Sequence, residues 1–448
     1  MSKTNPARGM RDFLPGDVRK REYVISIIKQ VYELYGFEPL ETPAVENLDT
    51  LLGKYGDEGN QLIFRILKRG GKLDLKHSNS ENDLSDLALR YDLTVPLARV
   101  AAQYRDKLPK FFKRYQIQPV WRADRPARGR FREFFQCDVD WIGSESPVVE
   151  AELISAVAEV LRRLGFSDFR IRINHRDLLF GILKHFGVAG ELLNSAITVI
   201  DKLDKTGPAG VTEELKLLGI ERADEIVRVI GKSADSAAEL RTSLTAGISA
   251  GEALNTLDSI ISLSSCPEIV IDPSLARGLS YYTGAIFEIN VPDLSGSLGG
   301  GGRYDGLIGM FGKQDIPACG FSLGLERILV VMDERKMFPP EIELAAPADV
   351  LITLFSKDTV RESLRLASDL RAAGIRVTVY PEPDKIGKQI KYADQINVPI
   401  VLILGESELS EQTVALKQLG QSRQIIVKRS QLVDEIKAMT ANLVRFSQ

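Results

Sequence analysis

Two neighbouring segments that alternate like β-strands constrain this chain more than any other feature of its sequence. Residues 112–123 (FKRYQIQPVWRA) and 131–143 (FREFFQCDVDWIG) alternate with a period of two, and the turn-forming sequence DRPARG separates them. A short loop between two such runs is typical of strands that pair in opposite directions. We therefore expect an antiparallel pair, and any fold of the chain must contain it.

The same region carries a local excess of positive charge. Between Arg105 and Arg132 stand ten Lys or Arg residues and two Asp residues, whereas the whole 448-residue chain has a formal charge of -3. The charge is interleaved with aromatic residues at Phe111, Phe112, Tyr115, Trp121, Phe131, Phe134 and Phe135. A charged run is often only a solvated surface, but the aromatic residues favour a site that receives phosphate groups.

The order of predicted elements favours an α+β fold with a mixed, mostly antiparallel sheet. Apolar residues at helical spacing predict a helix over residues 17–35, and Leu, Ala, Glu and Lys dominate a helical insertion over 177–263. Strand patterns lie on both sides of this insertion, and we interpret Gly299–Gly302 as a tight turn with close backbone approach before an apolar helix. Irregular alternation of strands and helices is typical of antiparallel rather than βαβ sheets.

Length and composition predict several domains. We expect a core over residues 1–335, a linker over 336–347 and a separate α/β domain over 348–448, in which strands and helices alternate. The stretch 68–86 is polar and rich in Gly, Ser and Asn, which predicts a mobile surface loop.

Several classes of protein are disfavoured. No apolar segment has the length of a signal peptide or a membrane span, so we expect a cytoplasmic protein without membrane attachment. Cys137, Cys266 and Cys319 are odd in number and far apart, and the chain has no zinc-ligand spacing. The glycine run lacks the context of a dinucleotide site, and no P-loop sequence occurs. We expect no zinc and no organic cofactor.

The paired segments gather charged groups that suit ATP. Side chains two residues apart share a face of a strand, so Arg122 and Asp124 can point into one cavity, as can Arg130 and Arg132. A guanidinium on a phosphate stabilises developing charge, and a carboxylate can hold the magnesium that bridges phosphates. From these residues alone, a basic hairpin that binds an RNA backbone is an equal alternative.

The sequence WRADRPARGRFREFFQ resembles motif 2 of class II aminoacyl-tRNA synthetases, and GFSLGLERI resembles their motif 3. The resemblance implies that Arg122 contacts the α-phosphate of ATP, with Asp124 nearby, and that Arg327 faces the γ-phosphate. It also implies that Arg130 lies close to the outer phosphates and that Phe134 stacks on adenine.

Two further sequences, ARGLSYYTG and GGGRYDG, resemble the pair that distinguishes histidyl-tRNA synthetases. The resemblance implies that Arg277 is catalytic together with Arg122, and that it approaches the α-phosphate and the substrate carboxylate. Asp140 and Tyr282 match positions that hydrogen-bond the imidazole nitrogens, which suits a neutral ring with one donor and one acceptor. The remaining positions implied to bind histidine are Asp92, Thr94, Gln136 and Tyr281.

The resemblance covers nearly the whole chain, and residues 348–448 resemble an anticodon-binding domain. It implies ATP-dependent ligation of L-histidine to the 3′ end of tRNA-His through a histidyl-adenylate, with release of AMP and pyrophosphate. Mg²⁺ would arrive with ATP rather than be fixed by the protein alone. The sequence ETP around Pro43 resembles motif 1, which implies a homodimer.

Two alternatives share this resemblance. One is a catalytically inactive paralogue that acts as a regulatory subunit of ATP phosphoribosyltransferase. It typically lacks the anticodon-binding domain and several ATP-contacting arginines, and this chain has both. The other is a tRNA sensor with a dead active site, which would have lost Arg277, Arg327 or the pair Asp140 and Tyr282.

Overall fold

The computed structural model describes residues 4–55, 60–78, 80–243, 248, 250–277, 281–312, 314–421 and 423–445. These residues form two compact units. The first comprises the residues up to Leu14 together with Arg21–Met337, and the second comprises Pro15–Lys20 and the residues from Phe338 onward. Within the described ranges, no helix is both long and apolar enough to cross a membrane.

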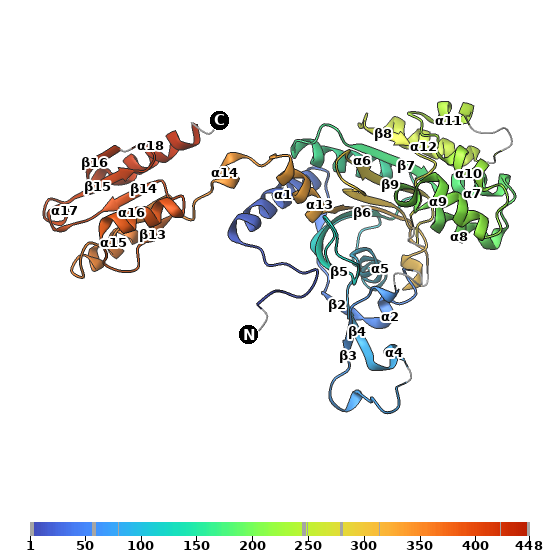
Figure 1. The fold of residues 1–448 in the computed structure, drawn as a ribbon, viewed down its shortest axis with the longest axis horizontal. Helices are drawn as coiled ribbons and strands as arrows, with labels where there is room; N and C mark the ends of the chain where they lie inside the picture. The colour runs from blue at the N-terminus through green and yellow to red at the C-terminus, as the bar shows by residue number, and fades with distance from the viewer. Residues whose placement is uncertain are drawn as a thin grey trace. The chain divides into compact units, whose positions relative to one another are not determined.

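An eight-stranded sheet forms the centre of the first unit (Figure 1). Its strands are β1 (Glu38–Pro39), β5 (Phe112–Trp121), β6 (Glu133–Ile142), β7 (Arg170–His175), β8 (Ile269–Ile271), β9 (Ala285–Asn290), β10 (Gly299–Arg303) and β11 (Ala318–Gly324). Their order is β1-β5-β6-β11-β10-β9-β7-β8, with parallel pairs at the two edges and antiparallel pairs between them. The predicted antiparallel pair, β5 with β6, and the predicted mixed sheet are confirmed.

Four helices pack around this sheet: α1 (Pro15–Leu34), α5 (Thr94–Gln103), α6 (Val148–Arg163) and α13 (Leu325–Glu334). Helix α6 packs on β6 and β11, and its residues Leu153, Val157 and Leu161 are fully buried. Their spacing of four residues places them on one face of the helix. The helix predicted over residues 17–35 is confirmed as α1, and Gly36 follows its end with a positive φ of 77°.

The predicted helical insertion lies between β7 and β8. It contains α7 (Arg176–His185), η2 (Gly190–Leu192), α8 (Leu193–Ile200), α9 (Leu203–Leu217), α10 (Ala223–Ile230), α11 (Ala237–Ser243) and α12 (Gly251–Leu263). Figure 1 shows these helices grouped at the end of the sheet where β7 and β8 lie. Pro208, which follows Gly207 with its φ of 71°, kinks α9.

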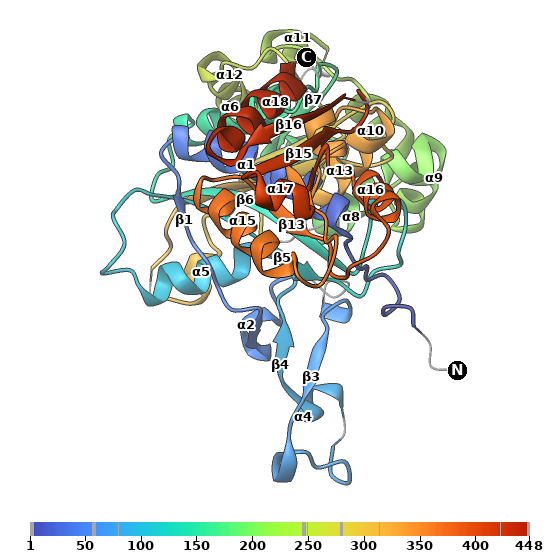
Figure 2. The ribbon, with the colours of Figure 1, turned by 90° about the vertical axis from the view of Figure 1, so that its left-hand side faces the viewer.

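A three-stranded sheet extends away from the larger one (Figures 1 and 2). It consists of β2 (Val45–Asn47), β4 (Ser85–Leu89) and β3 (Arg65–Leu67), in that order, and is accompanied by α2 (Leu48–Leu51), η1 (Gly70–Lys72) and α4 (Glu81–Leu84). The prediction that residues 68–86 are only a loop was wrong, because η1, α4 and the start of β4 lie within them. The N–H of Ser80 donates to Asp83 Oδ2 at 2.9 Å, a local cap that needs no apolar burial.

The second unit is an α/β domain, as predicted. Its sheet has the order β13 (Val377–Val379), β12 (Val350–Ile352), β14 (Ile400–Ile403), β15 (Thr413–Gln418) and β16 (Arg423–Lys428), with the first three strands parallel. Its helical elements are α14 (Pro340–Glu343), α15 (Val360–Ala372), α16 (Ile386–Gln395), α17 (Glu406–Ser410), η4 (Arg429–Gln431) and α18 (Leu432–Arg445). Buried Val350, Leu366 and Leu402 belong to one core. Helix α14 lies inside the stretch predicted as a linker.

Candidate active site

Polar side chains gather on one face of β5, β6 and β11 at the centre of the large sheet. In β6, Gln136, Asp138 and Asp140 are two residues apart and therefore share a face, and all three are buried. The register sets Asp140 opposite Arg114 of β5 and Gly320 of β11. The predicted strand pair thus brings a fully buried arginine to a buried carboxylate.

A pocket opens beside these strands. Its lining includes Thr94 from the start of α5, Asp138 and Asp140 from β6, Tyr282 and Tyr304. Three residues that the sequence predicted to bind histidine, Thr94, Asp140 and Tyr282, therefore converge on one cavity. They come from segments far apart in the chain.

Two buried neighbours hold the carboxylate of Asp140. Its Oδ2 lies 2.8 Å from Arg114 Nη2, and the hydroxyl of Tyr304 donates a hydrogen bond to its Oδ1. Burial raises the pKa of Asp140 above its usual value, while Arg114 and the hydrogen bond from Tyr304 oppose that rise. Asp140 is thus kept in one orientation by a cation and a phenol.

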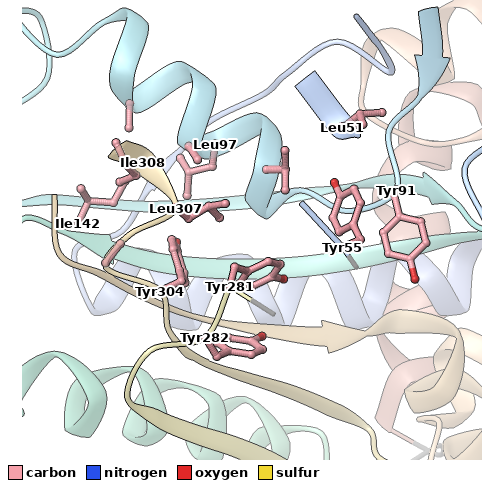
Figure 3. Close-up of a cluster of buried hydrophobic side chains, with 14 of the residues drawn as sticks. Leu51, Tyr55, Tyr91, Leu97, Ile142, Tyr281, Tyr282, Tyr304, Leu307 and Ile308 are labelled. Carbon is pink, nitrogen blue, oxygen red and sulfur yellow. The ribbon is translucent and has the colours of Figure 1, made fainter. Parts of the chain in front are cut away.

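Asp92 lies just before α5, and a separate group of tyrosines holds it. Its Oδ1 accepts hydrogen bonds from Tyr55 Oη and from the N–H of Val95, both at 3.0 Å, and its Oδ2 accepts one from Tyr281 Oη at 3.5 Å. Figure 3 shows Tyr55, Tyr281 and Tyr282 within one buried cluster. Burial raises the pKa of Asp92, and these hydrogen bonds oppose the rise. Tyr281 therefore contacts Asp92, while Tyr282 faces the pocket.

Four arginines that the sequence assigned to ATP or to the substrate carboxylate interact electrostatically. We call Arg122, Arg130, Arg277 and Arg327 the arginine cluster. Burial lowers the pKa of Arg327 to about 10, and the positive charges of the other three members lower it too, against the opposing charge of Glu288. Positive charges that lower the pKa of Arg327 in this way favour the binding of a polyanion such as a triphosphate.

Individual contacts place two members of the arginine cluster beside aromatic rings. Arg122 donates from Nε to the carbonyl of Tyr91 at 3.1 Å, and its guanidinium carbon lies 5.2 Å from the centre of the Phe134 ring. Arg277 lies 3.5 Å from Glu288 Oε2, and its guanidinium carbon is 5.7 Å from the centre of the Tyr282 ring. Arg277 is therefore a member of the arginine cluster that also lies beside the pocket. Residues 278–280 of its motif lie outside the described residues.

The tight turn predicted at Gly299–Gly302 was wrong, but the close backbone approach predicted with it is confirmed. These glycines belong to β10, an interior strand between β9 and β11. A Cβ on Gly300 would overlap the guanidinium of Arg277, and one on Gly301 would overlap the backbone carbonyl of Gly320. The glycines are needed because a side chain and a neighbouring strand approach closely, not because the chain reverses direction.

Not every predicted residue reaches the pocket. Asp124 and Arg130 lie in the loop between β5 and β6, and neither lines the cavity. Gln136 lies on the polar face of β6, where its Nε2 donates to Ser322 Oγ at 2.8 Å. Among the described residues, no group of three or more His, Cys, Asp or Glu side chains is arranged to hold a metal ion.

The sequence reasoning missed four residues of the site: Arg114, Asp138, Tyr304 and Tyr55. Arg114 follows the alternation of the predicted strand, so the sequence could have shown on which face of the strand it lies. It could not have shown that its partner is Asp140. Asp138 and Tyr304 stand inside the quoted sequences QCDVDWIG and GGGRYDG. Tyr55 had no signal, because its contact with Asp92 joins segments that only the fold brings together.

Comparisons with known proteins show the family. Residues 9–328 match the family model of histidyl-tRNA synthetase, and residues 349–439 match that of an anticodon-binding domain. The chain belongs to the histidyl-tRNA synthetase family. Within this family, it is 40% identical to the histidine–tRNA ligase of Cytophaga hutchinsonii over 97% of the chain and 100% of that protein. It is 42% identical to that of Porphyromonas gingivalis, over 94% of the chain and 96% of that protein.

Solved structures of the family have the same fold. The crystal structure of histidyl-tRNA synthetase from a Nostoc species has a TM-score of 0.77 and 30% identity, and covers 98% of this chain and 100% of that one. A Bacillus halodurans structure titled ATP phosphoribosyltransferase regulatory subunit/histidyl-tRNA synthetase has a TM-score of 0.70 at 22% identity, covering 87% of this chain and 97% of that one. That likeness concerns the fold alone, and the full-length ligase relatives do not favour the regulatory paralogue. The family uses ATP.

Proposed function

We propose that this chain ligates L-histidine to the 3′ end of tRNA-His in two steps. Family membership across both units supports the activity, and the anticodon-binding domain supports tRNA as a substrate. The observation that carries the proposal is the pocket itself. Polar groups suited to an imidazole ring line it, and Arg277 of the arginine cluster lies beside Tyr282 at its edge.

In the first step, a carboxylate oxygen of histidine attacks the α-phosphorus of Mg-ATP. The bond from that phosphorus to the bridging oxygen of the β-phosphate breaks, giving histidyl-adenylate and pyrophosphate. Arg122 and Arg277 stabilise the charge on the α-phosphate, and Arg277 also orients the carboxylate. Arg327 and Arg130 hold the outer phosphates, and adenine stacks on Phe134.

Histidine itself is held at both ends. Its α-ammonium donates to Asp92 and Thr94, Gln136 provides a further polar contact, and the ring is bound by Asp140 and Tyr282. A site whose buried polar groups match one ligand rejects analogues that leave those groups unpaired, because an unpaired buried group is costly. Tyr281 acts through Asp92, whose Oδ2 it contacts at 3.5 Å.

In the second step, the 3′-hydroxyl of the terminal adenosine attacks the adenylate carbonyl. An ester forms, AMP leaves, and the hydroxyl proton passes to an oxygen of the departing phosphate. No side chain takes this proton in the proposed step, so positioning supplies the catalysis. Mg²⁺ enters with ATP, near Asp124, and the enzyme needs neither zinc nor an organic cofactor.

We also propose that the protein works in the cytoplasm as a homodimer, with the segment around Pro43 in the interface. The domain boundaries are residues 1–335, 336–347 and 348–448. Sedimentation equilibrium tests the dimer, since a monomer at micromolar concentration would contradict it. Limited proteolysis tests the boundaries, which predict cleavage within 336–347.

The decisive experiment is ATP–pyrophosphate exchange with each of the twenty amino acids, in which histidine alone should support exchange. Arg277→Ala should reduce histidine-dependent exchange by about a thousandfold, because a charge-stabilising donor is lost, while tRNA binding is retained. Arg163→Ala is the control, since that arginine pairs with Glu159 on a half-exposed helix face. Exchange that survives Arg277→Ala removes the catalytic assignment.

A further inference from the structure

Asp138 is a buried acid in the pocket to which the proposed reaction gives no task. It is 2% exposed and lies on β6 between Gln136 and Asp140, on the same face of the strand. It lines the pocket together with Asp140 and Tyr282. A carboxylate at this depth is costly unless it is paired, so its partners decide what it does.

The contacts of Asp138 are incomplete. A hydrogen bond from Ser322 of β11 reaches its carboxyl group, yet its Oδ1 has no hydrogen-bond partner among the described residues. Asp140 Oδ2 also has no hydrogen-bond partner among the described residues, but it lies 2.8 Å from Arg114 Nη2 in an ion pair, and the hydroxyl of Tyr304 donates to its Oδ1. One buried oxygen of Asp138 is therefore left to accept a hydrogen bond from a molecule in the pocket.

The charges around Asp138 leave room for one more cation. The titratable or charged groups that interact with it or adjoin it are Arg114 from β5, Cys137 and Asp140 from β6, Arg90 and Asp92 after β4, Tyr32 from α1, and Tyr282. Arg90 is turned to the carbonyls of Thr42 and Pro119. Once Asp92 receives the substrate ammonium, Asp138 and Asp140 share the single cation Arg114.

We propose that Asp138 is a specificity-determining residue that accepts the second N–H of the substrate ring, so that histidine is bound as the imidazolium cation. This inference rests on the proposed function and changes it at one point, because Asp138 takes the place of Tyr282 as the hydrogen-bond partner of the second ring nitrogen. A neutral imidazole donates one hydrogen bond and accepts one, whereas the cation donates two. Asp140 receives the first N–H and Asp138 Oδ1 receives the second, with Tyr282 beside the ring.

The extra proton comes from the carboxyl group of Asp138 in the pocket. Burial raises the pKa of Asp138 to about 7, Arg114 opposes that rise, and Asp140 adds to it. Near neutral pH the carboxyl group is therefore partly protonated. When histidine enters, the proton moves from the Asp138 carboxyl to the ring nitrogen, and the resulting carboxylate and imidazolium attract each other without net uptake of protons.

The test compares histidine with 1,2,4-triazol-3-ylalanine, whose ring has a similar shape but is far less basic. In ATP–pyrophosphate exchange, Asp138→Asn should raise the KM for histidine at least about tenfold, the effect of a lost hydrogen bond to a charged group, with a smaller change in kcat. It should affect the triazole much less, so that discrimination between the two substrates falls. Asp272→Asn, a change outside the pocket, should leave the discrimination unchanged.

Two outcomes would overturn the inference. One is an unchanged KM for histidine in Asp138→Asn, and the other is an equal loss for both substrates, which a purely structural role would give. The ¹⁵N NMR spectrum of ring-labelled histidine bound to the wild-type protein needs no variant, and both nitrogens should be protonated. One unprotonated nitrogen contradicts the proposal. If the wild-type protein shows no exchange with histidine, the proposed function fails instead.

Discussion

The arginine cluster and the pocket are adjacent regions with opposite electrostatic imbalances. In the cluster, burial lowers the pKa of Arg327 and the other cations lower it further, whereas burial raises the pKa of the pocket acids Asp138 and Asp140 and of nearby Asp92. Each region is thus poor in the charge that its proposed ligand carries. The cluster is therefore suited to phosphates, and the pocket is suited to an ammonium group and a ring that can be protonated.

The difference shows how one site can order two substrates. A histidine or an ATP molecule in the wrong region would meet like charge, so electrostatics selects the placement before close contacts form. Arg277 lies at the boundary, between Glu288 and the Tyr282 ring. In the proposed reaction, the carboxylate of histidine meets the α-phosphate there.

The largest expected effect comes from removing Arg114. In the described part of the chain, it is the only cation that forms an ion pair with an acid of the pocket. Arg114→Leu leaves Asp140 buried without its partner, and the free energy of unfolding should fall by about 3–5 kcal/mol, the range for breaking a buried ion pair from one side. Urea unfolding measures it. Arg114→Leu with Asp140→Asn should regain part of this loss, because the unpaired charge is gone. A single variant as stable as the wild type would mean that the pair stabilises nothing.

Much of this comparison could be predicted from the sequence, and the limits were physical. Alternation with a period of two revealed the strand pair, and the same period sets Asp138 on the face of Asp140, although the motifs did not single out Asp138. Alternation does not set the register between strands, so the pairing of Arg114 with Asp140 could not be derived. The contact of Tyr55 with Asp92 depends on tertiary packing and left no local signal.

The glycine run shows a different limit. Four consecutive glycines predict a turn on conformational grounds, since glycine alone tolerates many backbone angles. Here their function is steric, because Gly300 makes room for Arg277 and Gly320 makes room for Asp140. Both sides of the comparison therefore depend on missing Cβ atoms, and neither partner could be named before the strands were paired.

An effect of intermediate size is the pH dependence of stability. The pKa of Asp138 is about 7 in the folded protein and near 4 in an unfolded chain, so the folded state holds a proton that the unfolded state has lost. The contribution of this group to stability should therefore fall as pH rises from about 4 to 7, and the loss should be complete above pH 7. Asp138→Asn should remove that fall. Urea unfolding at pH 5 and pH 8 measures this change in the wild-type protein and in Asp138→Asn. An equal change in the free energy of unfolding between the two pH values in both proteins would contradict the raised pKa of Asp138.

The smallest effect concerns the phenol that orients Asp140. Tyr304→Phe removes one hydrogen bond to a buried carboxylate, so the free energy of unfolding should fall by about 1.5–3 kcal/mol. If the hydrogen bond positions Asp140 for the ring, the KM for histidine should rise several-fold while the KM for ATP stays constant.

Tyr115→Phe is a matched control, because Tyr115 also lies buried and donates to a carboxylate, Glu33, at 2.8 Å, but on the other face of β5 from Arg114. It should cost similar stability and leave the KM for histidine unchanged. Equal KM values in both variants would show that Tyr304 stabilises the fold without orienting the carboxylate. The pocket would then owe the orientation of Asp140 to Arg114 alone, and its acidic side would be held less firmly than the arginine cluster beside it.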